Sequence, residues 1–318
     1  MAHLYQHGLA TVHVQDYQRR REMRSSKATP PIIDPSPTPL SREHYTDDFC
    51  GRSAEAFLKR WAVGEPWLLW VNFPGPHEPF DPPAELLKRY ERVEFPPPVD
   101  PDPRQVHDYQ ALRRCYAGMI EGIDEWIGRL ITAVKQRGEL ENTVIVFASD
   151  HGEMLGDHGC WYKSVAYEGS IHVPLVIAGP GIRNNSVSDS LVELIDVSAT
   201  MLDFAGLSLP DDCDARTLRP VLTGERNSHR DVQLCELGCW RAIIDGQYKL
   251  IEDDEADARL FDLKSDPAER GNLLPDRPGI AAALSARLGR ERALDKCINP
   301  ERPESSGVQQ WARQDSNL

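Results

Sequence analysis

The sequence predicts an α/β fold with a mixed, largely parallel central sheet flanked by helices, followed by a small C-terminal antiparallel sheet with one helix. Two apolar, β-branched segments, 143–148 and 173–178, have the character of strands buried in a parallel or mixed sheet. Helical periodicity alternates with them and is clearest over 109–138, which favours an α/β arrangement. Beyond Gly224, short strand-like segments separated by turn residues indicate an antiparallel meander.

The N-terminal half reads as a polar segment followed by helix, strand and loop. Residues 1–45 are polar and rich in proline, and their pattern supports only a short helix around 16–23. Residues 47–62 have the apolar spacing of an amphipathic helix, and 67–73 read as a buried strand. A proline-rich loop over 74–103 then precedes the long helix, and loops of that length tend to line binding sites.

The C-terminal half begins with a helix predicted over 196–206. Four strands of the meander are predicted at 232–235, 240–244, 248–251 and 260–263, with a final helix at 279–294 packing on them. The predicted organisation is a proline-rich N-terminal segment (1–45), an α/β core (46–225), a small antiparallel subdomain (226–296) and a disordered tail (297–318).

Composition excludes several classes of function. The formal net charge of −14 repels phosphate backbones and anionic lipid, so we expect no nucleic-acid partner. The longest apolar run, 67–71, is far shorter than the roughly 20 residues of a membrane helix. Residues 1–22 lack the pattern of a secretory signal, and seven cysteines in this spacing do not resemble a disulfide framework. We therefore expect a cytoplasmic protein.

The strongest local signal is the segment SDHGEMLGDHGCWYK, from Ser149 to Lys163, directly after a predicted strand. Ligands of open α/β sheets bind beyond the carboxyl ends of strands, so Asp150 and His151 are candidate ligands of one divalent cation. The alternative is that Asp150 caps a helix and His151 fills a hydrogen bond in the core. Lys163 is either a fixed positive charge for an anionic group or a solvated surface lysine. The second Asp-His pair, Asp157-His158, could complete a metal site, but the flanking Gly156 and Gly159 favour a role in shaping the loop.

A second candidate is His77, in the loop Phe73-Pro-Gly-Pro-His-Glu-Pro-Phe80 that follows the predicted strand 67–73. The neighbouring prolines stiffen the backbone, which suits a side chain that must point steadily into a crevice. His77 could donate a hydrogen bond to an anionic oxygen or act as general acid to a leaving group. A purely structural histidine is the alternative.

Taken together, these motifs resemble the sulfatase family of the alkaline-phosphatase-like superfamily. The resemblance rests on four segments in family order: the loop Asn72–Phe80, the segment ending at Lys163, VPLVIAGPG at 173–181, and LFDLxxDPxE at 260–269 followed by Asn272-Leu273. It implies that Asp150 and His151 are two metal ligands, and that Lys163 and His77 contact the sulfate oxygens and the leaving-group side. His151 stands where many members have Asn, as in members resembling phosphonate monoester hydrolases and choline-sulfatase-like enzymes. The implied metal is Ca²⁺, with Mn²⁺ or Mg²⁺ as alternatives, and the implied partner is a small-molecule sulfate ester.

The family's nucleophile motif, C/S-x-P-S-R, is not present at any of the seven cysteines. The nearest approximation, Thr38-Pro-Leu-Ser-Arg42, has its proline one position too early, and Asp47-Asp48 opens a predicted helix where the family's paired acidic ligands would follow a strand. We therefore expect the C-terminal two-thirds of a sulfatase-like hydrolase with an incomplete alkaline-phosphatase-like fold and little or no turnover alone. Phosphate or phosphonate monoester hydrolysis and a non-catalytic anion- or metal-binding role are the alternatives. The sequence does not predict the oligomeric state.

Overall fold

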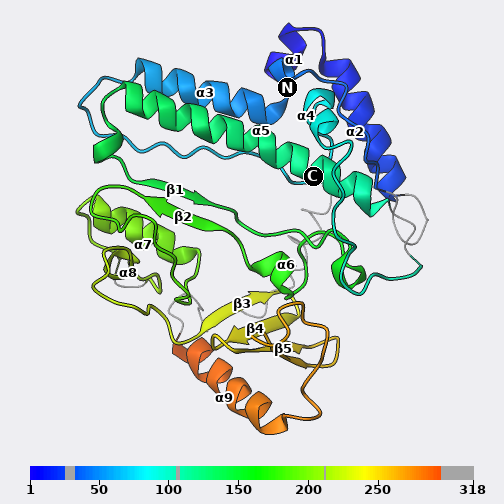
Figure 1. The fold of residues 1–318 in the computed structure, drawn as a ribbon, viewed down its shortest axis with the longest axis vertical. Helices are drawn as coiled ribbons and strands as arrows, with labels where there is room; N and C mark the ends of the chain where they lie inside the picture. Colours follow the sequence, from blue (N-terminus) through cyan, green and yellow to red (C-terminus); the bar gives the residue numbers. More distant parts are fainter. Residues whose placement is uncertain (26–32, 105–107, 211–212, 295–318) are drawn as a thin grey trace. The chain divides into compact units, whose positions relative to one another are not determined.

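The computed structural model describes residues 1–25, 33–104, 108–210 and 213–294, which form two compact units. The first unit contains residues 1–143 and also 155–161. The second contains 144–154 and the chain from Tyr162 onward. Figure 1 shows the helices and strands of both units.

The first unit is helical. Its α-helices are α1 (Ala2–Gln6), α2 (Ala10–Ser25), α3 (Thr46–Arg60), α4 (Ala84–Arg89) and α5 (Tyr109–Gln136), with short 3₁₀ turns η1 (Arg42–His44), η2 (Leu140–Asn142) and η3 (Asp157–Gly159). The long helices α3 and α5 lie side by side (Figure 1) and confirm the helices predicted at 47–62 and 109–138. Gly51 of α3 lets this contact form, because a Cβ there would lie 2.1 Å from Cδ2 of the buried Trp126.

The N-terminal segment is more ordered than the sequence predicts. Helix α2 has 16 residues, where the pattern supported only a short helix around 16–23. The reason is that α2 is held by charge more than by an apolar stripe. Arg20, a buried residue, pairs with Asp16 one turn earlier and donates to the backbone carbonyls of Asp34 and Ser36. Hydrophobic periodicity cannot reveal a helix stabilised in this way.

The predicted strand 67–73 is wrong as a strand, because these residues form no ladder with any other described segment. The alternation of a strand is nevertheless visible in their burial. Trp67 and Leu69 pack against the apolar cluster between α3 and α5, whereas Leu68 and Trp70 are 71% and 78% exposed. The alternation of apolar residues predicts which side chains are buried. It does not predict whether another strand lies alongside to form hydrogen bonds with this one.

The second unit contains β1 (Ile145–Ala148) and β2 (Leu175–Ala178), which confirm the two predicted core strands. The prediction of a largely parallel sheet is not met by the described residues, where β1 and β2 pair with each other in antiparallel register, Ile145 opposite Ala178. They are also not buried on both faces, since Phe147 and Val176 are exposed. An apolar run of four residues predicts a strand but does not fix the direction of its partner.

The small C-terminal sheet is as predicted. Strands β3 (Gln233–Leu237), β4 (Trp240–Ile244), β5 (Tyr248–Asp253) and β6 (Arg259–Asp262) form an antiparallel meander in sequence order, and α9 (Pro278–Leu294) packs on it (Figure 1). The core between them contains Val232, Ile243, Leu250, Leu260, Ala281, Leu284 and Leu288. The remaining helices of this unit are α6 (Glu168–Ile171), α7 (Ile195–Phe204) and α8 (Arg219–Leu222).

The six cysteines within the described residues are free thiols, so no disulfide is formed among them. No helix in the described part of the chain combines the length and hydropathy of a membrane-spanning segment. The tail predicted to be disordered, 297–318, lies outside the described residues.

The α3–α5 contact gives a direct test of the first unit. Gly51→Ala places a methyl group inside the ring system of Trp126, and we expect it to lower the free energy of unfolding by about 1–3 kcal/mol. Gly128→Ala in α5 is the matched control, because a Cβ there meets nothing within 4 Å. That change should be neutral or slightly stabilising, since alanine favours the helix. Urea denaturation followed by circular dichroism measures both, and equal stability of the two variants would contradict the packing described.

Candidate functional site

Asp150 and His151 follow β1 directly, at the end where ligands of α/β folds bind. The Asp150 side chain is 87% exposed, and Oδ1 accepts a hydrogen bond from the backbone N–H of His151. Oδ2 lies 3.8 Å from Nε2 of His151. Asp150 caps no helix, because the residues that follow it are not helical, and the His151 side chain is 30% exposed.

The His151 ring is oriented as metal-ligating histidines are. Its Nδ1 lies 2.8 Å from the carbonyl oxygen of Gly152, which can only accept, so Nδ1 carries the proton and Nε2 has the lone pair in the neutral ring. A backbone carbonyl that fixes the second ring nitrogen is the usual outer partner of a histidine ligand. Oδ2 of Asp150 and Nε2 of His151 therefore fit two positions around one divalent cation. A hard cation needs about six to eight donors, and within the described residues no third His, Cys, Asp or Glu joins this pair.

Lys163 is held beside this segment by backbone contacts. The N–H of Met154 donates to the carbonyl of Tyr162 (3.0 Å), and the N–H of Tyr162 donates to Oε1 of Glu153 (2.6 Å). On the other side of Lys163, the indole N–H of Trp240 in β4 donates to the carbonyl of Ser164 (3.1 Å). Lys163 is half-buried, so it is not the freely solvated lysine of the alternative interpretation. Glu153 and Trp240 have positioning roles that sequence reasoning missed.

Gly152 packs its backbone directly against α6. Its N–H donates to the carbonyl of Ser170 (2.7 Å), and a Cβ at this position would lie 2.1 Å from the carbonyl oxygen of Gly169. Only glycine fits so close an approach of two backbones. The turn after Asp150 and His151 is therefore fixed by the position of α6.

Helix α6 is in turn anchored to the small sheet by a buried ion cluster. Lys249 of β5 is fully buried and pairs with the carboxylates of Glu168 in α6 and Glu269. Burial alone would raise the pKa of Glu168, but the hydrogen bond from His172 and the charge of Lys249 hold this pKa at about 2. The N–H of Glu168 also donates to Glu269 (2.6 Å). The C-terminal sheet thus determines where the Asp150 segment lies.

The second Asp-His pair shapes a loop, as the flanking glycines predict. Oδ1 of Asp157 accepts from the guanidinium of Arg113 (2.8 Å) and from the N–H of Val99 (2.9 Å). The N–H of His158 donates to the carbonyl of Val99 (2.6 Å), and its φ of 54° belongs to a tight turn. These contacts hold Asp157 in the loop of the first unit.

His77 lies in the first unit, in a loop that a buried carboxylate supports. Nδ1 of His77 lies 2.9 Å from the carbonyl oxygen of Glu78. As in His151, a neutral ring therefore has its proton on Nδ1 and its lone pair on Nε2. The N–H of Gly75 donates to Oδ1 of Asp47 in α3 (2.9 Å). A Cβ at Gly75 would lie 2.3 Å from Oδ2 of Asp47, so this approach also needs glycine.

Asp150, His151 and Lys163 belong to the second unit, and His77 belongs to the first. The convergence of these two groups on one cleft stays a prediction.

The two sequences that mimic missing family features are structural. Asp47 and Asp48 lie in the first turn of α3, as expected, and Asp48 accepts from the indole of Trp126 (2.8 Å). Arg42 pairs with Asp48 and Glu125, and Leu40 is buried. Neither pair offers a nucleophile or a ligand set.

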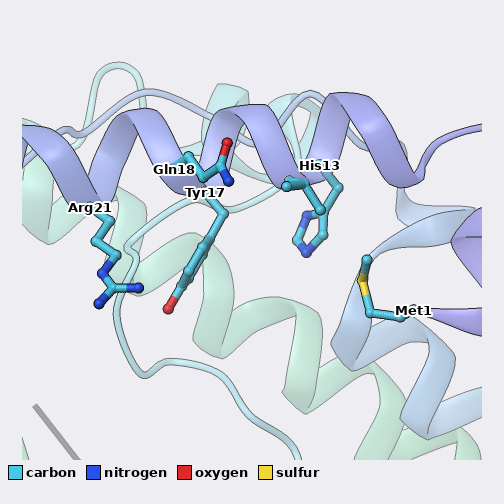
Figure 2. A pocket seen from close by; sticks show the side chains of 6 residues that line it. Met1, His13, Tyr17, Gln18 and Arg21 are labelled. Atoms are coloured by element: carbon cyan, nitrogen blue, oxygen red, sulfur yellow. The ribbon is translucent and has the colours of Figure 1, made fainter. Parts of the chain in front are cut away.

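A hollow of about 300 Å³ lies along α2 (Figure 2), and none of the four predicted site residues lines it. His13, Tyr17 and Arg21 project from one side of the helix toward it, with Met1 at one end. Nothing in this set forms a nucleophile–base pair, so size alone does not make this hollow the functional site.

Comparison with protein-family models identifies the class of protein. The model described as "Sulfatase" matches residues 6–207, which include His77, Asp150, His151 and Lys163. A second model, "N-sulphoglucosamine sulphohydrolase, C-terminal", matches residues 156–293. The chain belongs to the sulfatase family, and its α/β fold is the sulfatase fold.

Individual relatives agree with this assignment. The chain is 33% identical to an arylsulfatase of Clostridium perfringens, over 69% of this chain and 51% of that protein, and 33% identical to a choline-sulfatase of Rhizobium meliloti, over 70% and 49%. A phosphonate monoester hydrolase from Silicibacter pomeroyi superposes with a TM-score of 0.72 at 26% identity, over 91% of this chain and 69% of that one. The chain spans about half the length of the curated relatives it matches.

The burial of Asp47 predicts a pH dependence of stability. Burial, together with the charge of Asp48, raises the pKa of Asp47 from 3.8 to about 6. Because the folded-state pKa is the higher one, folding favours the protonated carboxyl. Its stabilising contribution is complete below pH 3.8 and is lost as the pH rises through 6.

Asp47→Asn keeps an acceptor for the Gly75 N–H but cannot ionise. We expect it to match the wild type at acidic pH and to be more stable at pH 8, by at most about 3 kcal/mol. Urea denaturation at both pH values measures this, with Asp124→Asn, on the exposed face of α5, as the control. The same loss of stability on raising the pH in wild type and Asp47→Asn would contradict the assignment.

Proposed function

We propose that this chain carries the metal- and anion-binding part of a hydrolase of sulfuric esters. The observation that supports the proposal best is the pairing of the Met154 and Tyr162 backbones, which holds Lys163 beside the segment of Asp150 and His151. A carboxylate, an imidazole and an amine then belong to one continuous segment, Ser149 to Lys163. A sulfate monoester requires this combination of charges.

Each residue has a defined role in this proposal. Oδ2 of Asp150 and Nε2 of His151 hold a divalent cation, with Ca²⁺ preferred and Mn²⁺ or Mg²⁺ as alternatives. When bound, such a cation neutralises charge on the sulfate and activates a nucleophile. Lys163 holds one sulfate oxygen as negative charge develops on the group. Where the family's nucleophile is supplied to the sulfur, His77 would donate a proton from Nε2 to the alcohol oxygen that the nucleophile displaces.

The 318 residues do not include the family's nucleophile motif, so we propose that this chain alone binds sulfate esters but turns them over slowly or not at all.

A second candidate is hydrolysis of phosphonate or phosphate monoesters on the same scaffold. Its support is the superposition on a phosphonate monoester hydrolase and the imidazole of His151 in the ligand set. Binding of nitrophenyl sulfate and of a phenyl phosphonate monoester, compared on the same protein, distinguishes the two. Tighter binding of the phosphonate would replace the sulfate ester as the substrate class.

The role of Lys163 gives the main test. Without its ammonium, one charge-assisted hydrogen bond to the anion is lost, so Lys163→Ala should weaken binding of nitrophenyl sulfate by about 10- to 100-fold in calorimetry with Ca²⁺ or Mn²⁺ present. Lys264→Ala, an exposed lysine in the turn after β6, should bind as the wild type does.

Turnover of nitrophenyl sulfate by the same preparations should stay near the uncatalysed rate. Vigorous turnover by the wild type would show that the chain does supply a nucleophile. Loss of that turnover in Lys163→Ala would still support the role of Lys163. Equal binding by wild type and Lys163→Ala would overturn the anion site itself.

A further inference from the structure

Three histidines gather in the first unit, and none of them is a residue assigned to the sulfate-ester site. His3 and His7 lie one turn apart at α1, and His44 belongs to the 3₁₀ turn η1. One ring nitrogen from each lies within 4.8 Å of one from each of the other two. Among the described residues, no other group of three or more His, Cys, Asp or Glu side chains meets this condition.

The geometry of this histidine cluster is close to that of a bound site. Nε2 of His3 lies 3.1 Å from Nδ1 of His44, and the ring of His7 is 4.6 Å from that of His3 and 4.7 Å from that of His44, between centroids. Nitrogen ligands about 2.1 Å from a tetrahedral metal lie about 3.4 Å from each other. Small side-chain rotations therefore suffice to bring all three nitrogens to one ion.

The scaffold holds the three rings in place without the ion. His3 lies in α1 and His7 is the residue directly after its last turn, and the backbone N–H of His7 donates to the carbonyl of His3 (3.3 Å), so the two rings come from adjacent turns of backbone. An apolar cluster of Leu4, Ala10 and Leu40 packs α1 and the start of α2 against the segment that leads into η1. The ring of Phe49 in α3 lies 5.3 Å from that of His3 and backs the cluster.

The donor chemistry selects the kind of metal. Three imidazole nitrogens suit Zn²⁺ and its neighbours in the transition series, whereas Ca²⁺ and Mg²⁺ require oxygen ligands. Charged groups nearby are of both signs: Oε2 of Glu43 lies 4.0 Å from Nε2 of His44, and the guanidinium of Arg52 donates to the backbone carbonyl of Glu43. The ring nitrogens, rather than local charge, are therefore the basis of affinity.

We propose that His3, His7 and His44 form a second metal site, which binds one Zn²⁺ ion and cross-links α1 to η1. Three protein ligands leave a fourth tetrahedral position for water or an added ligand, and the exposure of His7 gives access to it. This zinc site is independent of the oxygen-rich cation site proposed at Asp150, because it uses different residues and a different class of metal.

Zinc titration of the untagged chain against a chromophoric chelator tests the proposal. We expect about one Zn²⁺ per chain, unaffected by excess Ca²⁺. His7→Gln and His44→Gln should each weaken zinc binding by more than about 100-fold, because loss of a ligand exceeds the effect of losing an outer-shell partner. Co²⁺ added in place of zinc should show the visible absorption of a tetrahedral complex in the wild type alone.

The controls separate this site from folding and from the sulfate-ester site. His13→Gln, which changes the nearby histidine on the wall of the α2 hollow (Figure 2), should bind zinc as the wild type does. His7 is exposed, so His7→Gln should keep its circular dichroism spectrum and its Lys163-dependent binding of nitrophenyl sulfate. Zinc uptake by a His7→Gln/His44→Gln double variant equal to that of the wild type, or no stoichiometric uptake by either, would overturn the proposal.

Discussion

The close approach of Gly152 to the backbone of α6 is the constraint on which the candidate site depends. The N–H of Gly152 and the carbonyl of Ser170 hold the turn that follows Asp150 and His151, and the space between them excludes any Cβ. The buried Lys249, paired with Glu168 and Glu269, fixes α6 to the small sheet. Breaking such a buried ion cluster is costly, since it leaves charges without partners. The C-terminal sheet thus acts as the support of residues nearly a hundred positions earlier in the chain.

In the first unit, a similar close approach to a glycine supports the loop of His77. A buried carboxylate of α3, Asp47, holds the backbone of Gly75 two residues before His77, again at a distance that only glycine allows. In both units the Nδ1 of a candidate site histidine lies against the carbonyl oxygen of the next residue, Glu78 for His77 and Gly152 for His151. Each ring is therefore set in one orientation before any ligand binds, which reduces the cost of ordering it later.

Helices and strands that are specified by neighbouring residues were predictable from the sequence. Helix α5 and the meander β3–β6 follow from periodicity and turn residues, and the candidate ligands Asp150 and His151 follow from their place after an apolar strand. Features that depend on distant partners were not. The direction of β2 and the lack of a ladder at 67–73 depend on which backbone lies alongside, and α2 depends on Arg20 meeting carbonyls beyond the helix. The meeting of His44 with His3 and His7 joins residues about 40 apart and leaves no local signal.

The central proposal, which rests on the family resemblance, is that His77 and the Asp150–His151 pair serve one site. Paramagnetic broadening tests it directly: Mn²⁺ is titrated into the His7→Gln variant, which lacks the zinc site, while the imidazole resonances are followed by NMR. The account predicts that His77 broadens together with His151, and that Asp150→Asn abolishes both effects. Broadening of His151 with a sharp His77 signal would contradict it.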